Sequence, residues 1–254
     1  IPWLAWRRRF GVATLTLIFA LGWNLVPDLT FPLNNGSFYL ERWLHDVVSP
    51  TFGGNSVVAT TEGIWGRFNE QNQSLGGMIA RLFSGGRSDA TLPGIVTLSA
   101  DGVRLLTLAL YGSIMGAVLW MTRRKSPAMP WCSYSGEREE GAVLRELAII
   151  LLLSLLFSPM TSPAHLCMIF PGVVVLMQDS WKTRNSALIV TLGFAALFMS
   201  IVHKDLIGRS SVEFLRFYGV QTWQCLLLLA GLLWSCMISR KEHMHKDFTP
   251  ESPA

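Results

Sequence analysis

Residues 217–238 read FYGVQTWQCLLLLAGLLWSCMI, a stretch without a single Asp, Glu, Lys or Arg. An uncharged apolar run of about 20 residues is long enough to cross the hydrocarbon layer of a bilayer as a helix. Five further apolar blocks precede it, at residues 10–27, 97–121, 143–158, 164–178 and 186–202. The sequence therefore predicts an all-α, polytopic membrane helix bundle of about six spans.

The composition agrees with a membrane protein and disfavours an ordinary soluble domain. Hydrophobic residues make up 50% of the chain and charged residues 15%, whereas soluble domains carry about 25% charge. The net charge of +4 requires no nucleic-acid partner. The four cysteines show no metal-ligand spacing, and we expect neither a metal nor a cofactor.

The lysines and arginines predict the orientation, because cytoplasmic loops are enriched in them. One alternate set of loops holds thirteen of these residues and the other holds eight. We therefore expect a plasma (inner) membrane protein with both ends of the chain in the cytoplasm, including a polar tail at residues 239–254. The segments expected to face outward are 28–96, 158–163 and 203–216.

Two blocks, 143–158 and 164–178, are short for full spans, and Pro171-Gly172 interrupts the second. They form either two spans or a re-entrant hairpin. A break at membrane depth must be buried in protein or line a wet cavity, because lipid cannot satisfy its backbone groups. The break at 158–163 is therefore a first indication of a site.

The outward region, residues 28–96, contains two predicted helices. Ser37 can cap the first, in which Leu40 and Leu44 share an apolar face, so that the helix lies in the membrane interface. The second runs from Asn72 to Phe83, where Gly76-Gly77 permits close approach of another chain segment.

A polar run from Arg67 to Ser74 stands at the start of this second helix. Free N–H groups and the positive end of the helix dipole make such a start an anion site, with Asn72 or Ser74 as the cap. Arg67 and Arg81 can add charge-assisted hydrogen bonds to a phosphate. The alternative is an ordinary capped surface helix without a ligand.

His165 lies at the outward start of the fourth block. A histidine at a membrane boundary serves near neutral pH as an acid, a base or a hydrogen-bond donor to a phosphate. Alternatively, it is a structural group whose hydrogen bonds are made within the protein. The charged loop His203-Lys204-Asp205, with Arg209 and Glu213 nearby, is interpreted as a solvated loop.

Three segments resemble glycosyltransferase family 87. Asn72-Gln73-Ser74-Leu75, followed by Arg81-Leu82, resembles its N-Q-S-L…R-L stretch. Ser37-Phe38-Tyr39 resembles its S-x-x-Y-W region, with Leu40 in place of the tryptophan. Ser158-Pro159-Met160-Thr161 resembles the start of its S-P-I-S-W-x-H-H segment, where Ser162 and Ala164 depart from the pattern and His165 keeps the second histidine. The resemblance covers roughly residues 37–178.

The resemblance implies a GT-C glycosyltransferase. Such an enzyme transfers a sugar, typically mannose, from a polyprenyl-phosphate carrier to a lipid-linked or cell-envelope glycan acceptor on the extracytoplasmic face. His165 is then the expected catalytic group, and the expected substrate-binding residues are Asn72, Gln73, Ser74, Arg81 and Arg67. The family's catalytic acid lies in its first outer loop, near the N-terminus. We expect residues 1–238 to be the C-terminal part of the transmembrane domain, without that acid.

Two other functions stay open. A transporter or flippase of lipid-linked sugars also suits outer-loop helices and broken spans, but the sequence has no inverted repeat and few ionisable groups within its spans. In a non-catalytic membrane scaffold, the polar outward loop is incidental.

Overall fold

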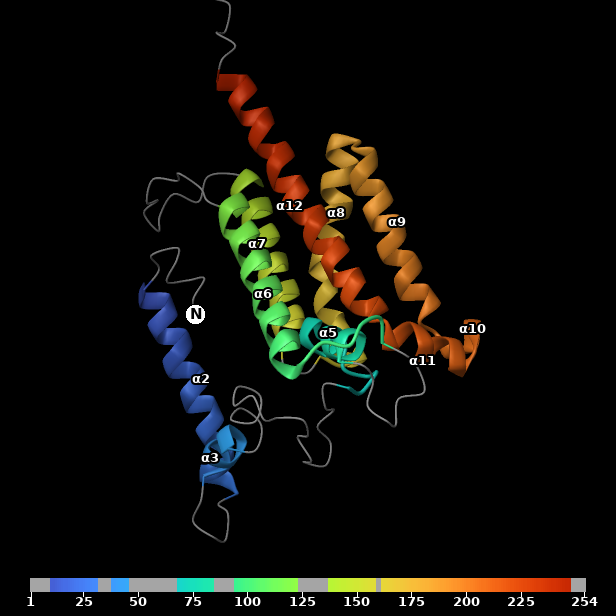
Figure 1. The fold of residues 1–254 in the computed structure, drawn as a ribbon. Coiled ribbons are helices and arrows are strands. Elements are labelled where there is room, and N and C mark those ends of the chain that lie inside the picture. The colour runs from blue at the N-terminus through green and yellow to red at the C-terminus, as the bar shows by residue number, and fades with distance from the viewer. Residues whose placement is uncertain are drawn as a thin grey trace, which may run out of the picture. The chain divides into compact units, whose positions relative to one another are not determined.

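The computed structural model of the chain describes residues 10–31, 38–45, 68–84, 94–122, 137–158 and 161–247 (Figure 1). The chain divides into two compact units, residues 1–64 and residues 65–254. Regular structure in the described residues is helical, and the β-pairing among them is an isolated antiparallel bridge between Ser84 and Thr97. The predicted all-α membrane helix bundle is confirmed.

The first unit consists of α2 (Phe10–Thr30) and the short helix α3 (Tyr39–Trp43). Helix α2 is apolar around most of its circumference and exposes most of its large side chains, as expected for a helix whose solvent is lipid. The Asp28 carboxylate accepts a hydrogen bond of 2.5 Å from the Tyr39 backbone N–H. This bond fastens the start of α3 to the last turn of α2. Ser37, the predicted cap of this helix, lies outside the described residues.

The second unit contains the remaining helices in chain order. They are α5 (Leu75–Phe83), α6 (Ala100–Thr122), α7 (Glu137–Phe157), the 3-10 helix η2 (Pro163–Ile169), α8 (Phe170–Thr183), α9 (Ser186–Ile201), α10 (Lys204–Ile207), α11 (Arg209–Phe217) and α12 (Val220–Asp247).

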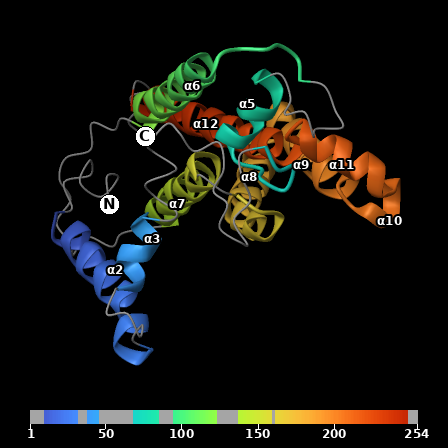
Figure 2. The ribbon, with the colours of Figure 1, turned by 60° about the horizontal axis from the view of Figure 1, so that its bottom comes forward.

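Helix α12 is the central element of this unit. It packs on α6, α7, α8 and α9. Figure 1 shows it running obliquely through the bundle, with α6 and α7 on one side and α9 on the other, and the turned view draws α6 on one side of it and α7 on the other (Figure 2). Leu228 and Leu232 are fully buried. At Gly231, a Cβ atom would lie 3.0 Å from the Thr191 methyl group and 3.1 Å from Leu176. The missing side chain therefore lets α8 and α9 approach α12 closely.

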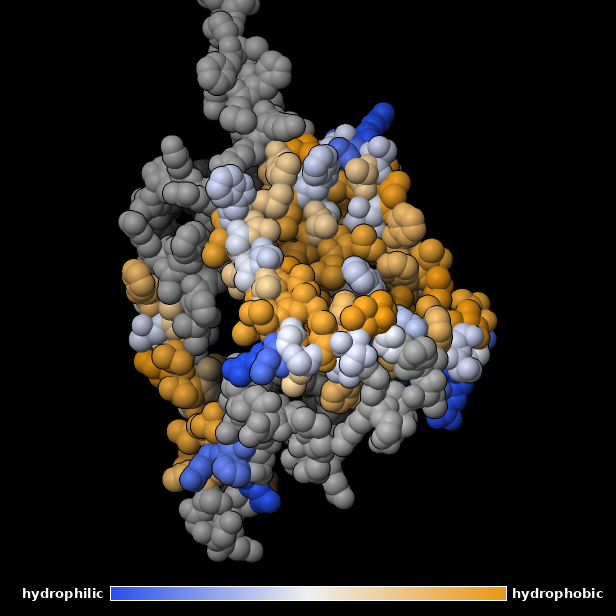
Figure 3. All heavy atoms as spheres, viewed as in Figure 1, coloured by the Kyte–Doolittle hydropathy of each residue, from blue (hydrophilic) through white to orange (hydrophobic). Residues whose placement is uncertain are grey.

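Four helices in the described part of the chain are long and apolar enough to cross a membrane: Phe10–Thr30, Ala100–Thr122, Pro163–Thr183 and Val220–Ile238. The other two predicted blocks are also helical. The helix for the third block, α7, starts at Glu137 and carries charges in its first turns, and α9 has 16 residues. On the visible face of the bundle, apolar side chains cover the middle and the most hydrophilic residues lie toward its ends (Figure 3).

Two boundaries differ from the prediction. Pro171 does not break the fourth block, because it occupies the first turn of α8, where a missing N–H costs nothing. The irregularity falls earlier, in η2. Helix α12 continues past Ile238 to Asp247. Residues 239–247 of the predicted polar tail are therefore part of this helix.

Candidate functional site

The Asn72–Ser74 segment forms the start of α5 as a tight, buried turn. Ser74 is the helix cap, and its hydroxyl accepts a hydrogen bond from the Gly77 N–H at 3.1 Å. The Asn72 side-chain oxygen accepts one from the Ser74 N–H at 3.1 Å. Of the two predicted caps, Ser74 is the one used. Side-chain oxygens of the chain itself therefore accept from the Ser74 and Gly77 N–H groups, two of the groups at the helix start that we expected to bind an anion.

The 72–74 and 158–165 segments, 84 or more residues apart in sequence, lie in contact. The Gln73 N–H donates to the Thr161 carbonyl at 2.7 Å, and the Thr161 N–H donates to the Asn72 side chain at 3.3 Å. The Thr161 hydroxyl in turn donates to the Leu155 carbonyl near the end of α7 at 2.5 Å. Thr161 and Ser162, on the η2 side of the break, are thus buried against protein, as an irregular backbone in a membrane protein requires.

Gln73 extends this contact to α11 and α12. Its carboxamide donates to the Glu70 carbonyl at 2.5 Å and to the Arg216 carbonyl at 2.9 Å. Its own carbonyl accepts from the Thr222 hydroxyl at 2.8 Å. We call the set Asn72, Gln73, Arg81, Thr161 and Thr222 the polar junction. Each of these residues is at most 2% exposed.

Arg81 is the only charged residue of the polar junction, and its guanidinium faces inward. Nε donates to the Phe217 carbonyl at 2.9 Å, and one terminal nitrogen donates to the carbonyls of Asn69 and Asn72 at 2.8 and 2.7 Å. The other terminal nitrogen donates to the Arg216 carbonyl at 3.3 Å. The cation therefore binds the carbonyl end of α11, where the helix dipole is negative.

Burial lowers the pKa of Arg81 to about 10, and the nearby Glu70 carboxylate partly opposes this shift. The side chain stays protonated at neutral pH. Since it is 1% exposed and donates to backbone carbonyls from all three nitrogens, Arg81 does not present its charge to a phosphate at the surface. The structure gives it a different task from the predicted substrate contact, because it holds the ends of α5 and α11 together.

His165 lies beside the polar junction but points outward. Its Nδ1 accepts a hydrogen bond from the Ser162 N–H at 3.0 Å, which closes a capping box at the start of η2. The neutral ring therefore carries its proton on Nε2. The side chain is exposed, and Nε2 has no hydrogen-bond partner within the described ranges. Of the predicted site residues that the structure describes, His165 alone presents a reactive atom to the outside.

The other predicted positions differ in their outcome. Arg67 lies outside the described residues. The charged segment before α11 is solvated as interpreted, because the His203 and Asp205 side chains are 70% and 73% exposed. It is not a loop throughout, since Lys204 and Asp205 begin the short helix α10. Sequence reasoning missed Thr161 and Thr222, whose roles depend on hydrogen bonds to distant backbone atoms.

It also missed an ion-pair cluster, which we define as Arg145, Asp179 and Ser235. Arg145 on α7 donates to both carboxylate oxygens of Asp179 on α8, at 2.9 to 3.1 Å, and the Ser235 hydroxyl of α12 donates to the same carboxylate. The Arg145 and Asp179 side chains are 12% and 13% exposed. The sequence feature that could have indicated this cluster is Asp179, a single carboxylate directly after the apolar block at residues 164–178.

The ion-pair cluster also shows how far α7 and α8 extend. Thr222 in the polar junction and Ser235 in the cluster are about 20 Å apart along α12, at 1.5 Å per residue. Helix α7 covers the same interval, since its Leu155 carbonyl accepts from Thr161 of the polar junction while its Arg145 belongs to the cluster. On the return, η2 and α8 together lead from Thr161 to Asp179 of the cluster. This depth favours two full crossings over the shallower re-entrant hairpin.

Within the described residues, no group of three His, Cys, Asp or Glu side chains is arranged to hold a metal ion. No protein-family model, curated protein or solved structure matches this chain. The geometry of its own residues therefore carries the functional argument.

Proposed function

We propose that this membrane protein is a glycosyltransferase that moves a sugar, with mannose the first candidate, from a polyprenyl-phosphate carrier to a lipid-linked or cell-envelope glycan acceptor. The observation that supports this proposal best is the 2.7 Å hydrogen bond between Gln73 and Thr161. It joins two segments that resemble the same family at one end of the bundle. We further propose that this end is the extracytoplasmic one, in a plasma (inner) membrane with both ends of the chain in the cytoplasm.

The chemistry assigns unequal roles to the residues of this end. Sugar transfer from a phosphate carrier needs donors for the departing phosphate and a base for the acceptor hydroxyl. His165 carries a proton on an exposed Nε2 and is therefore a suitable hydrogen-bond donor to the departing phosphate. Asn72 and Gln73 are buried and bond Thr161, two residues before η2, and Arg81 holds the Asn72 carbonyl. We assign these three a positioning role, because they hold the segment that leads into the helix of His165.

The proposal is tested by sugar transfer in proteoliposomes that contain the full-length protein, with its N-terminal part, and a polyprenyl-phosphate sugar. The His165→Ala variant is expected to lower kcat about 100-fold, the usual loss when one donor to developing charge is removed. Cys167→Ser is the matched control, since Cys167 is an exposed neighbour on the same 3-10 helix, and it is expected to keep full activity.

Two results would contradict the proposal in different ways. Unchanged transfer by His165→Ala overturns the assignment of the site. Movement of the lipid-linked sugar across the liposome, without formation of a glycosidic bond, overturns the enzyme and supports the flippase alternative.

A further inference from the structure

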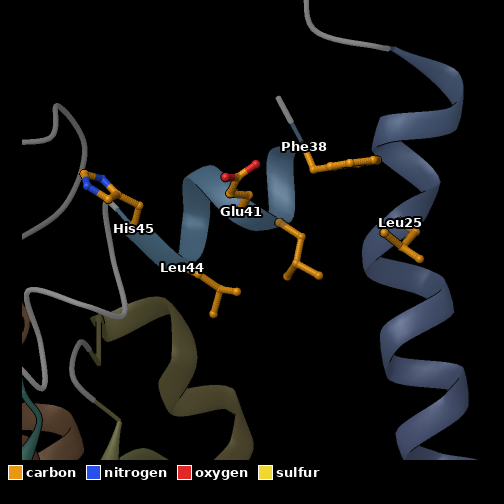
Figure 4. A pocket seen from close by; sticks show the side chains of 6 residues that line it. Leu25, Phe38, Glu41, Leu44 and His45 are labelled. Carbon is orange, nitrogen blue, oxygen red and sulfur yellow. The ribbon is translucent and has the colours of Figure 1, made fainter. Parts of the chain in front are cut away.

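The histidine side chains in the described part of the chain differ in what they hold in place. His45, just after α3, is exposed, and its ring points away from α2 (Figure 4). His203 precedes α10 without capping it through its side chain, and that side chain is 70% exposed. His165 instead closes a capping box at the start of η2. A change in the charge of His165 therefore acts on a helix end, whereas at the other two positions it acts on an exposed ring.

The capping box at η2 depends on an unprotonated Nδ1 atom. The Ser162 N–H donates to the His165 Nδ1 at 3.0 Å. The Ser162 hydroxyl lies 3.0 Å from the same atom and accepts from the His165 backbone N–H. Ser162 is 6% exposed, and Pro163, the next residue, has no N–H of its own. The His165 ring is thus the acceptor for a donor in a buried turn.

Protonation removes this acceptor. The charge of a histidine changes between about pH 5 and pH 8, and the imidazolium ring carries a hydrogen on both nitrogens. The Ser162 N–H and the Nδ1–H group would then face each other at 3.0 Å. The Nδ1–H group can turn to the Ser162 hydroxyl, but the Ser162 N–H is left without an acceptor. A buried N–H without a partner is unfavourable, so the first turn of η2 opens.

The residue before the capping box is held by bonds that do not titrate. The Thr161 carbonyl accepts from the Gln73 N–H at 2.7 Å, and the Thr161 N–H donates to the Asn72 side chain at 3.3 Å. Its hydroxyl donates to the Leu155 carbonyl at 2.5 Å. Helix η2 itself is a 3-10 helix, in which hydrogen-bond geometry is poorer than in an α-helix. Opening is therefore expected on the η2 side of Thr161 and not in the polar junction.

The charged side chains of the helices packed on η2 lie away from His165, as far as the structure describes them. Helix η2 packs on α7, α8 and α12. The charged residues on α7 and α8 lie away from the helix ends that meet η2, and they are Arg145, Glu146, Asp179 and Lys182. The titratable groups of η2, of α12 and around the polar junction are Cys167, Cys225, Glu70, Arg81 and Arg216. A variant changed only at residue 165 keeps all of these groups, so it separates their titration from that of His165.

We propose that the start of η2 is a pH-dependent hinge. Protonation of His165 removes the acceptor of the Ser162 N–H and frees the first turn of η2, while Thr161 stays bound to the polar junction. The direction of the exposed His165 ring then depends on the pH at this end of the bundle. The hinge is independent of the proposed function, because it requires only the capping box and not sugar transfer.

Hydrogen exchange of the full chain in nanodiscs tests the hinge, with fragmentation mass spectrometry that resolves single amides. Exchange is measured at about pH 7.5 and about pH 5, on either side of the range in which histidine changes its charge, and the times are scaled to the intrinsic rate at each pH. The protection of the Ser162 amide is expected to fall about fivefold at the lower pH, the factor that one helix cap contributes to an equilibrium. The Gln73 amide, which bonds to Thr161, is expected to keep its protection.

Two substitutions of His165 have opposite expected outcomes. In His165→Gln, the carboxamide oxygen accepts the Ser162 N–H as in an ordinary capping box and does not titrate, so protection is expected to be high at both pH values. In His165→Ala, this acceptor is missing, and protection is expected to be low at both. The matched control in the same sample is the Ala187 amide, which donates at 3.0 Å to the Asn185 side chain that caps α9, and its protection is expected to be the same at both pH values.

Three results would overturn the hinge. Equal protection of the Ser162 amide at both pH values in the wild type shows that protonation does not open the turn. The same loss in His165→Gln as in the wild type assigns the response to another titrating group. A loss at Gln73 together with the loss at Ser162 shows that the whole end of the bundle opens, and it excludes a hinge confined to η2.

Discussion

The polar junction and the ion-pair cluster lie about 20 Å apart along α12, and they hold the helices together by different means. In the ion-pair cluster, two charged side chains bind each other. In the polar junction, the charge of Arg81 binds backbone carbonyls. Both partners of a side-chain pair can be replaced by apolar groups, whereas backbone carbonyls stay whatever the sequence. The polar junction is therefore the part of this bundle that tolerates substitution least.

The largest effect is expected from Arg81→Leu. The change takes the guanidinium donor from the carbonyls of Asn72 and Phe217 and one of several donors from those of Asn69 and Arg216. We expect the free energy of unfolding to fall by about 3–5 kcal/mol. Equilibrium unfolding in mixed micelles, driven by added dodecyl sulfate, measures this loss. Arg209→Leu is the control, since the Arg209 side chain is 90% exposed, and its effect is expected within about 0.5 kcal/mol. Similar losses for the two variants would contradict the role given to Arg81.

The ion-pair cluster is expected to behave differently in single and double variants. Asp179→Leu alone leaves Arg145 without its partner and is expected to cost about 2–3 kcal/mol. The double variant Arg145→Met with Asp179→Leu removes both charges, and its stability is expected within about 1 kcal/mol of the wild type. The same unfolding titration measures both. A double variant at least as unstable as the single one would contradict the idea that the two charges of the ion-pair cluster can be replaced together by apolar groups.

A smaller effect is expected from Thr222→Val, which keeps the shape of the side chain and removes its bond to the Gln73 carbonyl. One buried neutral hydrogen bond contributes about 1 kcal/mol, and the unfolding titration should show a loss of that size. The control is Thr191→Val, because the Thr191 hydroxyl bonds only within its own helix, to the Ala187 carbonyl. An equal loss of unfolding free energy in Thr191→Val would show that the hydrogen bond between α12 and Gln73 does not stabilise the bundle more than one within a helix.

The smallest effect is expected from pH. The folded-state pKa of Arg81 is lowered to about 10, so the unfolded state binds more protons only above that pH. The stability linked to Arg81 should then rise with pH above about 10 and stay constant below about 9. The difference in unfolding free energy between wild type and Arg81→Leu is therefore expected to be equal at pH 6 and pH 8.5. A dependence on pH in this range would show that Arg81 is coupled to another titrating group.

The sequence predicted the helices well, because each apolar block has the length of a helix and Ser74 precedes its helix as a cap does. It also predicted the close approach at Gly76-Gly77, where Cβ atoms would lie 3.0 Å from Tyr111 on α6 and from Asn72. The inward direction of Arg81 was not predictable, because its partners are carbonyls that every residue carries. For Gln73 and Thr161, the sequence predicted only that both segments lie on the same side of the membrane. Their hydrogen bond was not predictable, since no pattern of residue types encodes a backbone hydrogen bond between distant segments.

The long sequence separation within the polar junction has a consequence for biosynthesis. Arg81 binds carbonyls 135 and 136 residues further along the chain. At translation rates of about 5–20 residues per second, those carbonyls are made roughly 7–27 s after Arg81 itself. Until then the α5 segment has no partner at α11, and we expect it to stay at the membrane surface, where water solvates the Arg81 guanidinium. The end of the bundle that carries Asn72 and His165 is thus completed only when the ribosome has made the start of α12, so a nascent chain cannot display a finished site before its central helix is in place.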